Sequence, residues 1–139
     1  MKAPPRYLVD TGVLIRFLSG EPPAQAAAAK SLFARTAAGK AVLDVSPVIV
    51  AETLHTLLSL YGVNRQLAAG KLSDLLRQRG IKLRDASQVL SALGRLQFTE
   101  VGFADAFLAA CAAEETVPVA SFDKDFGKFD DVTPYQPEA

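Results

Sequence analysis

A chain of 139 residues can bury the core of one domain, and nothing in its length calls for a second. Half of the residues are hydrophobic, which excludes an intrinsically disordered chain. The 15 basic and 15 acidic residues balance, which excludes a protein that coats nucleic acid through bulk positive charge, but not a nuclease whose acids are gathered in one site.

The sequence also indicates the compartment in which we expect the protein. No apolar run reaches the ~18 residues of a membrane span, and the first residues contain no apolar segment of a secretory signal. The single cysteine, Cys111, allows no internal disulfide, as is usual in a reducing compartment. We therefore expect a cytoplasmic protein that does not associate with membranes.

Short apolar strands alternate with helices along the chain. In chain order, the pattern predicts a strand at 6–9, helices at 13–18 and 23–38, a strand at 41–45, helices at 47–61 and 64–79, a strand at 81–83, helices at 85–96 and 102–115, and strands at 117–120 and 132–135. Capping residues set several of the helix starts, namely Ser46, Asn64, Asp85, and either Thr99 or Gly102. This alternation is typical of a mostly parallel sheet covered by helices.

Four acidic residues stand next to apolar stretches, where a carboxylate is costly unless a partner compensates it. They are Asp10, Glu52, Asp105 and Asp123. Asp10 and Asp123 follow predicted strands, whereas Glu52 and Asp105 lie near the starts of predicted helices. Ligands of parallel sheets gather at the carboxyl ends of the strands, so we expect the four carboxylates to share one crevice.

Carboxylates gathered in one crevice need a cation. Mg²⁺ or Mn²⁺ prefers oxygen ligands, lowers the pKa of bound water and neutralises charge on a phosphate, as hydrolysis of a phosphodiester requires. The sequence offers few other catalytic groups, because it has a single histidine, His55, and no nucleophile elbow or phosphate-binding loop. The pattern therefore predicts metal-dependent phosphodiester hydrolysis by water.

Four segments, taken together and in this order, resemble the PIN-domain ribonucleases, and among them the VapC-type toxins of toxin-antitoxin pairs. They are Leu8 to Ile15, Val45 to Leu54, Phe103 to Ala110, and Ser121 to Phe126. The resemblance implies a single PIN-like domain over residues 1–139, folded as a three-layer α/β/α sandwich around a mostly parallel sheet of four to five strands. It also implies endoribonuclease activity with Mg²⁺ or Mn²⁺, a homodimer, and a small antitoxin protein that blocks the site.

The resemblance further assigns roles to individual residues. It places the family's metal-binding catalytic acids on Asp10, Glu52, Asp105 and Asp123. Thr11 and Ser121 fall on hydroxyl positions that support the acidic site through hydrogen bonds, and Ser121 stands where Thr is common. Asp125 is a fifth candidate, either as a ligand or in support of one.

Each acid also has an ordinary structural explanation. Asp10 suits a helix N-cap, Asp105 complements a helix dipole, and both Asp123 and Asp125 suit a turn. Glu52 could be an exposed helical acid. Asp44, at the end of the second strand, suits either the same crevice or the loop before Ser46.

Several basic residues could contact the phosphates of a nucleic acid. The candidates are Arg16, Arg77, Arg79, Lys82 and Arg84. A solvated charged face is the alternative for the last four, because a run of like charges is usually exposed.

Two other functions compete with a ribonuclease. The segment Val9-Asp10-Thr11-Gly12 is also the active-site signature of aspartic proteases, which would act as a dimer sharing a proton between two Asp10 side chains. That class is built almost wholly of strands, whereas this sequence predicts helices. A catalytically silent PIN-like module that binds only RNA or protein is the second alternative.

Overall fold

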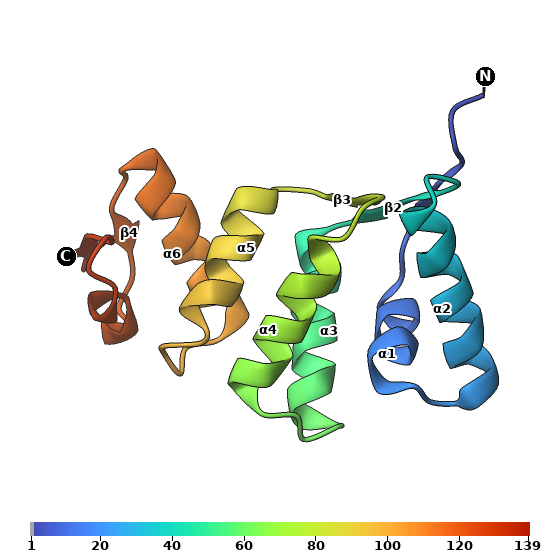
Figure 1. Ribbon diagram of the computed structural model, residues 1–139. Coiled ribbons are helices and arrows are strands. Elements are labelled where there is room, and N and C mark those ends of the chain that lie inside the picture. The colour runs from blue at the N-terminus through green and yellow to red at the C-terminus, as the bar shows by residue number, and fades with distance from the viewer. Residues whose placement is uncertain (1) are drawn as a thin grey trace. The chain divides into compact units, whose positions relative to one another are not determined.

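The protein is described by a computed structural model that covers residues 2–139 and contains six α-helices, one 3-10 helix and five strands in that range (Figure 1). Its internal contacts divide the chain into two compact units. The first ends at Asp85 and the second is Ala86–Ala139. The expected single-domain organisation stays a prediction.

The N-terminal unit is a parallel three-stranded sheet with four helices. Its elements are β1 (Arg6–Leu8), α1 (Thr11–Ser19), α2 (Pro23–Ala37), β2 (Val42–Val45), α3 (Pro47–Ser59), α4 (Arg65–Leu76) and β3 (Ile81–Leu83). The strands pair in the order β1-β2-β3, with Asp44 of β2 opposite Leu8 and Lys82. In Figure 1 the four helices of this unit lie below its strands.

The core of this unit forms where the helices pack on one another and on the strands. α1 packs against both α2 and α3, and α3 packs against α4. The fully buried side chains are mainly leucine and valine, including Leu14, Leu43, Val45, Val50, Leu72 and Leu75. Burying such side chains contributes about 1.5–3 kcal/mol each, so this interior stabilises the strand ends from which Asp10 and Ser46 follow.

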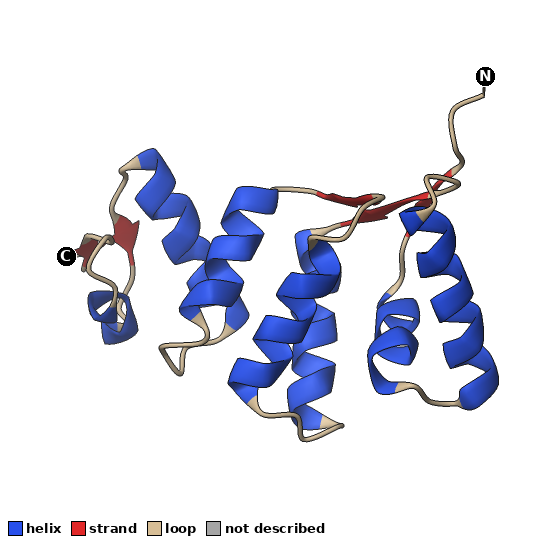
Figure 2. Cartoon of the chain, in the orientation of Figure 1, coloured by secondary structure: helices blue, strands red, loops and turns tan. Residues whose placement is uncertain are grey.

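The C-terminal unit is mainly helical, as Figure 2 shows by colour. Its elements are α5 (Ala86–Arg95), α6 (Phe103–Glu115), β4 (Val119–Ala120), a 3-10 helix η1 (Lys124–Lys128) and β5 (Pro134–Tyr135). α5 packs along α6, and β4 pairs in parallel with β5. The ion pair between Arg95 and Asp131 (2.5 Å) holds the segment before β5 to the end of α5.

The α/β fold class expected from the sequence is confirmed, and every strand pair is parallel. All predicted elements are present, with boundaries shifted by a few residues. Within residues 2–139 the five strands form a sheet of three and a sheet of two, where the sequence predicted one sheet. Asp123, for which a turn position was the structural alternative, is the N-cap of η1.

Asp85 was expected to cap α5, and that expectation is wrong. Its backbone is left-handed, with a φ of 51°, whereas the caps Asp10 and Ser46 are extended. An N-cap needs an extended backbone so that its side chain reaches the first free N–H groups of the helix.

The fold also bears on the protease alternative and on membranes. In the proteases that share the Asp-Thr-Gly signature this segment belongs to β-structure, but here Thr11 and Gly12 form the first turn of α1, so that alternative is wrong. No helix among residues 2–139 is long and apolar enough to cross a bilayer.

Candidate active site

Asp10 lies in the short connection between β1 and α1. It is the N-cap of α1, and its Oδ1 accepts a hydrogen bond from the Thr11 N–H at 2.9 Å. This bond occupies one carboxylate oxygen and leaves Oδ2 free for another partner. The structural explanation for Asp10 is therefore correct, and it is compatible with a second role as a ligand.

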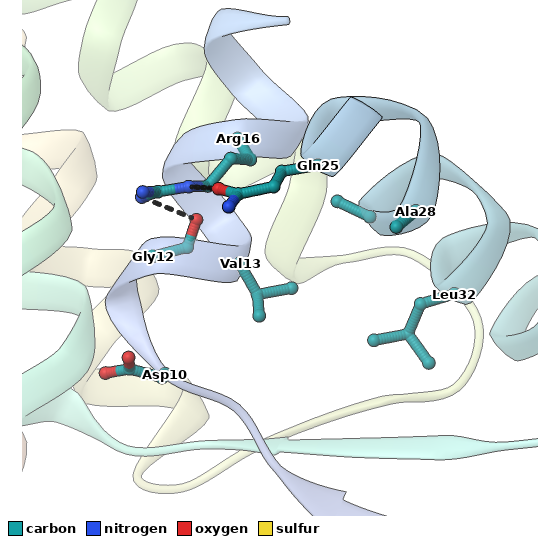
Figure 3. A pocket seen from close by; sticks show the side chains of 8 residues that line it. Asp10, Gly12, Val13, Arg16, Gln25, Ala28 and Leu32 are labelled. Carbon is teal, nitrogen blue, oxygen red and sulfur yellow. Dashed lines mark hydrogen bonds between the residues drawn. The ribbon is translucent and has the colours of Figure 1, made fainter. Parts of the chain in front are cut away.

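Two cavities meet at Asp10, both within the N-terminal unit. The first, about 460 Å³, lies between α1 and α2, and Figure 3 shows its lining. The second, about 410 Å³, lies beside the start of α3, with Ser46, Ile49 and Arg84 in its wall. Asp10 is thus the acid of this unit that is best placed to meet a bound ligand.

Thr11 follows Asp10 and carries an unpaired buried hydroxyl. The residue is 8% exposed, and its Oγ1 is the buried side-chain polar atom without a hydrogen-bond partner within residues 2–139. Leaving a buried hydroxyl unpaired costs about 1–3 kcal/mol, so a polar group bound beside Asp10 would gain by pairing with this atom.

Glu52 lies in α3, in the second turn after the Ser46 cap, whose Oγ accepts from the Ile49 N–H at 3.4 Å. The Glu52 side chain is exposed, while the next two residues, Thr53 and Leu54, are buried. Glu52 does not line either cavity beside Asp10. His55 is exposed on the same helix.

Asp44, on the central strand β2, is buried and paired with two arginines. Its Oδ2 lies 2.6 Å from Arg6 Nη2, and its Oδ1 accepts from Arg84 Nε at 3.0 Å. Burial by itself would raise the pKa of Asp44, but the hydrogen bonds and charges of Arg84 and Arg6 outweigh burial and hold that pKa below 3.8. Asp44 is therefore an ionised anchor that places Arg84 at the cavity beside Asp10.

Three acids lie close enough to interact within the C-terminal unit. Asp105 is in the first turn of α6, after the Gly102 N-cap. Burial raises the pKa of Asp105, and the negative charges of Asp123 and Asp125 raise it further. The three carboxylates repel one another, and a cation between them would relieve that repulsion.

A short hydrogen-bonded loop holds Asp123 in place. The Ser121 Oγ accepts from the Asp123 N–H at 2.9 Å, and Asp123 Oδ1 accepts from the Asp125 N–H at 2.8 Å. Asp125 also lies 2.8 Å from Lys128 Nζ, and this hydrogen bond and charge raise the pKa of Lys128. Ser121 thus supports the backbone that carries Asp123.

The predicted ligands consequently belong to two separate units. Asp10 and Glu52 are in the first, and Asp105, Asp123 and Asp125 are in the second. Across residues 2–139, no group of three or more His, Cys, Asp or Glu residues is arranged to hold a metal ion. Convergence of the four acids on one ion stays a prediction.

The basic candidates are spread over the N-terminal unit. Arg16 and Arg84 each line a cavity that also contains Asp10. Arg77 ends α4 and donates to Ser73 Oγ (3.3 Å), Arg79 donates to the Ala37 carbonyl (3.3 Å), and Lys82 is exposed on β3. Of these five basic residues, only Arg16 and Arg84 line a cavity together with Asp10.

Two residues that hold side chains of these cavities in place were not singled out from the sequence. Gln25 of α2 accepts from Arg16 Nε at 2.7 Å, and Arg6 of β1 pairs with Asp44. The signal for Arg6 was present, since an acid in a buried strand requires a cationic partner. Nothing in the sequence indicated Gln25, because its contact depends on how α2 packs against α1.

The chain matches the model of a protein family. The family model described as the PIN domain matches residues 7–132, which is most of the chain and includes parts of both units. No curated protein matches the chain.

Proposed function

The chain belongs to the PIN-domain family, and from that membership we propose that it is a metal-dependent endoribonuclease. PIN domains are generally nucleases, so a nuclease-type hydrolase activity follows from the family itself. The proposal adds the substrate, RNA, and the cofactor, Mg²⁺ or Mn²⁺. The observation that carries it is that the family match over residues 7–132 contains all four predicted catalytic acids.

The residues that would hold the metal are Asp10, Glu52, Asp105 and Asp123, with Asp125 as a further ligand. Three observations support this set. Asp10 Oδ2 is free, the Thr11 hydroxyl beside it is buried without a partner, and the charges of Asp123 and Asp125 raise the pKa of Asp105. All the donors are oxygens, which Mg²⁺ and Mn²⁺ prefer.

A divalent metal bound there would supply an acidified water and positive charge at the phosphate. The remaining tasks fall to the chain. Arg16 and Arg84 line the cavities beside Asp10 and could contact substrate phosphates, and Ser121 holds the loop that carries Asp123. Hydrolysis by water rather than by the ribose 2′-hydroxyl would leave a 5′-phosphate on the product.

The test is cleavage of total RNA by the purified protein. We expect activity to disappear on chelation and to return with Mg²⁺ or Mn²⁺. Asp10→Asn should lower the rate about 1,000-fold or more, because it removes one carboxylate from the metal site. Asp74→Asn, an exposed acid on α4, is the matched control and should keep wild-type activity. A 2′,3′-cyclic phosphate product would contradict attack by water.

A silent PIN-like module is the alternative that the same experiment addresses. It would bind RNA or protein and show no cleavage with any divalent metal. In such a module, the repulsion of Asp105 by Asp123 and Asp125 would lower stability without serving a metal site. The presence of these three acids therefore favours the enzyme over the silent module.

We further propose that the protein is the toxin of a type II toxin-antitoxin pair, acting in the cytoplasm as a homodimer that a small antitoxin inhibits. Support for this comes from the four sequence motifs that resemble VapC-type toxins. Expression of the chain alone should arrest growth, and Asp10→Asn should abolish the arrest. Sedimentation of the purified protein should give twice the 14.8 kDa mass of the chain.

A further inference from the structure

The cavity between α1 and α2 is lined by both charged and apolar side chains. A nucleotide likewise has a charged phosphate and a base with apolar faces. Its lining consists of Asp10, Gly12, Val13, Arg16, Gln25, Ala28, Ala29 and Leu32 (Figure 3). Its volume, about 460 Å³, lies within the range of small-ligand pockets, and such pockets are mostly apolar with a few convergent polar groups.

Arg16 supplies the positive charge of this cavity. Its Nε donates to Gln25 Oε1 at 2.7 Å, and its Nη1 lies 3.5 Å from the Gly12 carbonyl (Figure 3). Within residues 2–139 no carboxylate forms an ion pair with Arg16, so its charge is not neutralised and several N–H donors remain. Gln25 is a positioning residue, because it fixes the guanidinium without cancelling its charge.

Gly12 keeps the guanidinium close to Asp10. A Cβ on Gly12 would stand 3.2 Å from Arg16 Nη1 and 3.8 Å from Asp10 Oδ2, so both charged groups flank the space that the glycine leaves open. A phosphate bound by Arg16 would therefore lie next to the phosphodiester presented to Asp10.

The other wall of the cavity is apolar. Val13 of α1 and Ala28 and Leu32 of α2 face the same space in Figure 3. Ala28 is exposed, so a flat group can reach this wall from solvent. The apolar face of a nucleobase can lie against such a surface through van der Waals contact.

We propose that this cavity is a nucleotide subsite of the ribonuclease. Arg16, held by Gln25, binds a backbone phosphate next to the cleaved bond, and the adjoining base occupies the apolar wall formed by Val13, Ala28 and Leu32. The inference rests on the proposed function, and it names the part of the protein that binds the RNA nucleotide beside the cut.

The test measures affinity for a short single-stranded RNA in an Asp10→Asn background, in which binding is separated from cleavage. Ala28→Leu fills the cavity, and Ala27→Leu makes the same change at an exposed position of α2 outside it. We expect Ala28→Leu to weaken binding about tenfold, because the larger side chain displaces the base from the apolar wall, and Ala27→Leu to change it less than about twofold. For an abasic RNA of the same length, which has no base to occupy the wall, Ala28→Leu and Ala27→Leu should have equal affinity.

The charge of Arg16 is tested by the dependence of affinity on salt. Arg16→Gln should weaken binding and lower the slope of log K against log salt by about one. Gln25→Glu should do the same, because it places a carboxylate on the guanidinium, whereas Gln25→Ala should weaken binding and leave the slope unchanged. If Gln25 only stabilised the local fold, Gln25→Glu and Gln25→Ala would have the same effect on the salt slope.

Several outcomes would overturn the inference. Equal RNA affinity of Ala28→Leu and Ala27→Leu, in a wild-type protein that cleaves RNA with Mg²⁺, would remove the subsite and leave the proposed function standing. Loss of dimerisation by Ala28→Leu with unchanged RNA affinity would place a second copy in the cavity instead. Absence of both RNA binding and cleavage would overturn the inference and the proposed function together.

Discussion

Asp44 is a residue whose burial is tolerated only because two arginines reach it. Both guanidinium groups are about half exposed, so they contribute charge without being fully desolvated themselves. A buried carboxylate that loses such partners becomes strongly destabilising, and one that keeps them stabilises the strand on which it lies. The carboxylate of Asp44 thereby connects the three strands of the N-terminal unit, since Arg6 is on β1 and Arg84 follows β3.

We expect Asp44→Asn to lower the free energy of unfolding by about 2 kcal/mol. This is less than the ~3–5 kcal/mol for breaking a fully buried pair, because the exposed arginines regain water. The measurement is urea denaturation at pH 7, and Asp74→Asn on the surface of α4 is the matched control. Equal stability of the two variants would show that the arginines do not stabilise Asp44.

The contribution of Asp44 should also depend on pH. Its pKa is lower in the folded protein than its ordinary value of 3.8, so its stabilising effect is complete above that value. The effect is lost as the pH falls through the lower, folded pKa. The difference in unfolding free energy between wild type and Asp44→Asn should therefore be constant from pH 7 to about 5, and shrink below about 4.

Asp105 shows the opposite relation between charge and stability. Its pKa is raised, first by burial and then by Asp123 and Asp125, so the ionised side chain destabilises the metal-free protein. Asp105→Asn should raise the free energy of unfolding by about 0.5 kcal/mol, the scale of a partly exposed like-charge contact. Thermal denaturation in chelator measures this, with Asp130→Asn as an exposed control in the same unit. A destabilised Asp105→Asn would contradict the repulsion.

At the scale of elements, the turn between α4 and β3 depends on one glycine. Gly80 has a φ of 84°, and a Cβ there would lie 2.7 Å from the Thr36 carbonyl oxygen at the end of α2. That oxygen belongs to the backbone, which shifts less easily than the end of a flexible side chain. Gly80 therefore lets β3 pass close to α2 on its way to pair with β2.

We expect Gly80→Ala to cost about 3 kcal/mol, from the left-handed backbone and the steric overlap together. Gly62→Ala is the matched control, because Gly62 also has a positive φ, 60°, but nothing within 4 Å of a Cβ, so only about 1 kcal/mol should be lost. Chemical denaturation of both variants checks the difference. Equal losses would show that the contact with Thr36 relaxes freely.

The elements could be predicted from the sequence because their signals are local. Ser46 before Pro47 and Asn64 before Arg65 cap the helices that they were expected to cap. Asp85 failed as a cap because the same side chain also suits a left-handed turn residue, and the sequence does not distinguish the two conformations.

The candidate site could be predicted only in part. The position of Asp10 between β1 and α1 follows from the apolar pattern around it. For Asp44 the sequence indicated that a cationic partner was needed, but not that Arg6 would be that partner. Gln25 could not be predicted at all, because its contact with Arg16 depends on how α2 packs against α1. The division of the strands into sheets of three and two was equally hidden, since strand pattern alone does not state pairing.

At the scale of the whole molecule, the proposed site requires both units, so metal binding and the stability of the chain should be linked. A ligand that binds only the folded protein raises the free energy of unfolding by about 2.7 kcal/mol when its concentration is 100 times its Kd. For a chain of this size we expect saturating Mg²⁺ or Mn²⁺ to raise Tm by about 10 °C.

This shift should vanish in Asp10→Asn and in Asp105→Asn alike, because the two acids belong to different units and the proposed metal needs both. Asp74→Asn should keep the full shift, since that side chain lies on the surface of α4. Differential scanning calorimetry with and without chelator provides the measurement. A shift that disappears in Asp10→Asn but survives in Asp105→Asn would mean that the N-terminal unit holds the ion alone, and the four-acid site would have to be abandoned.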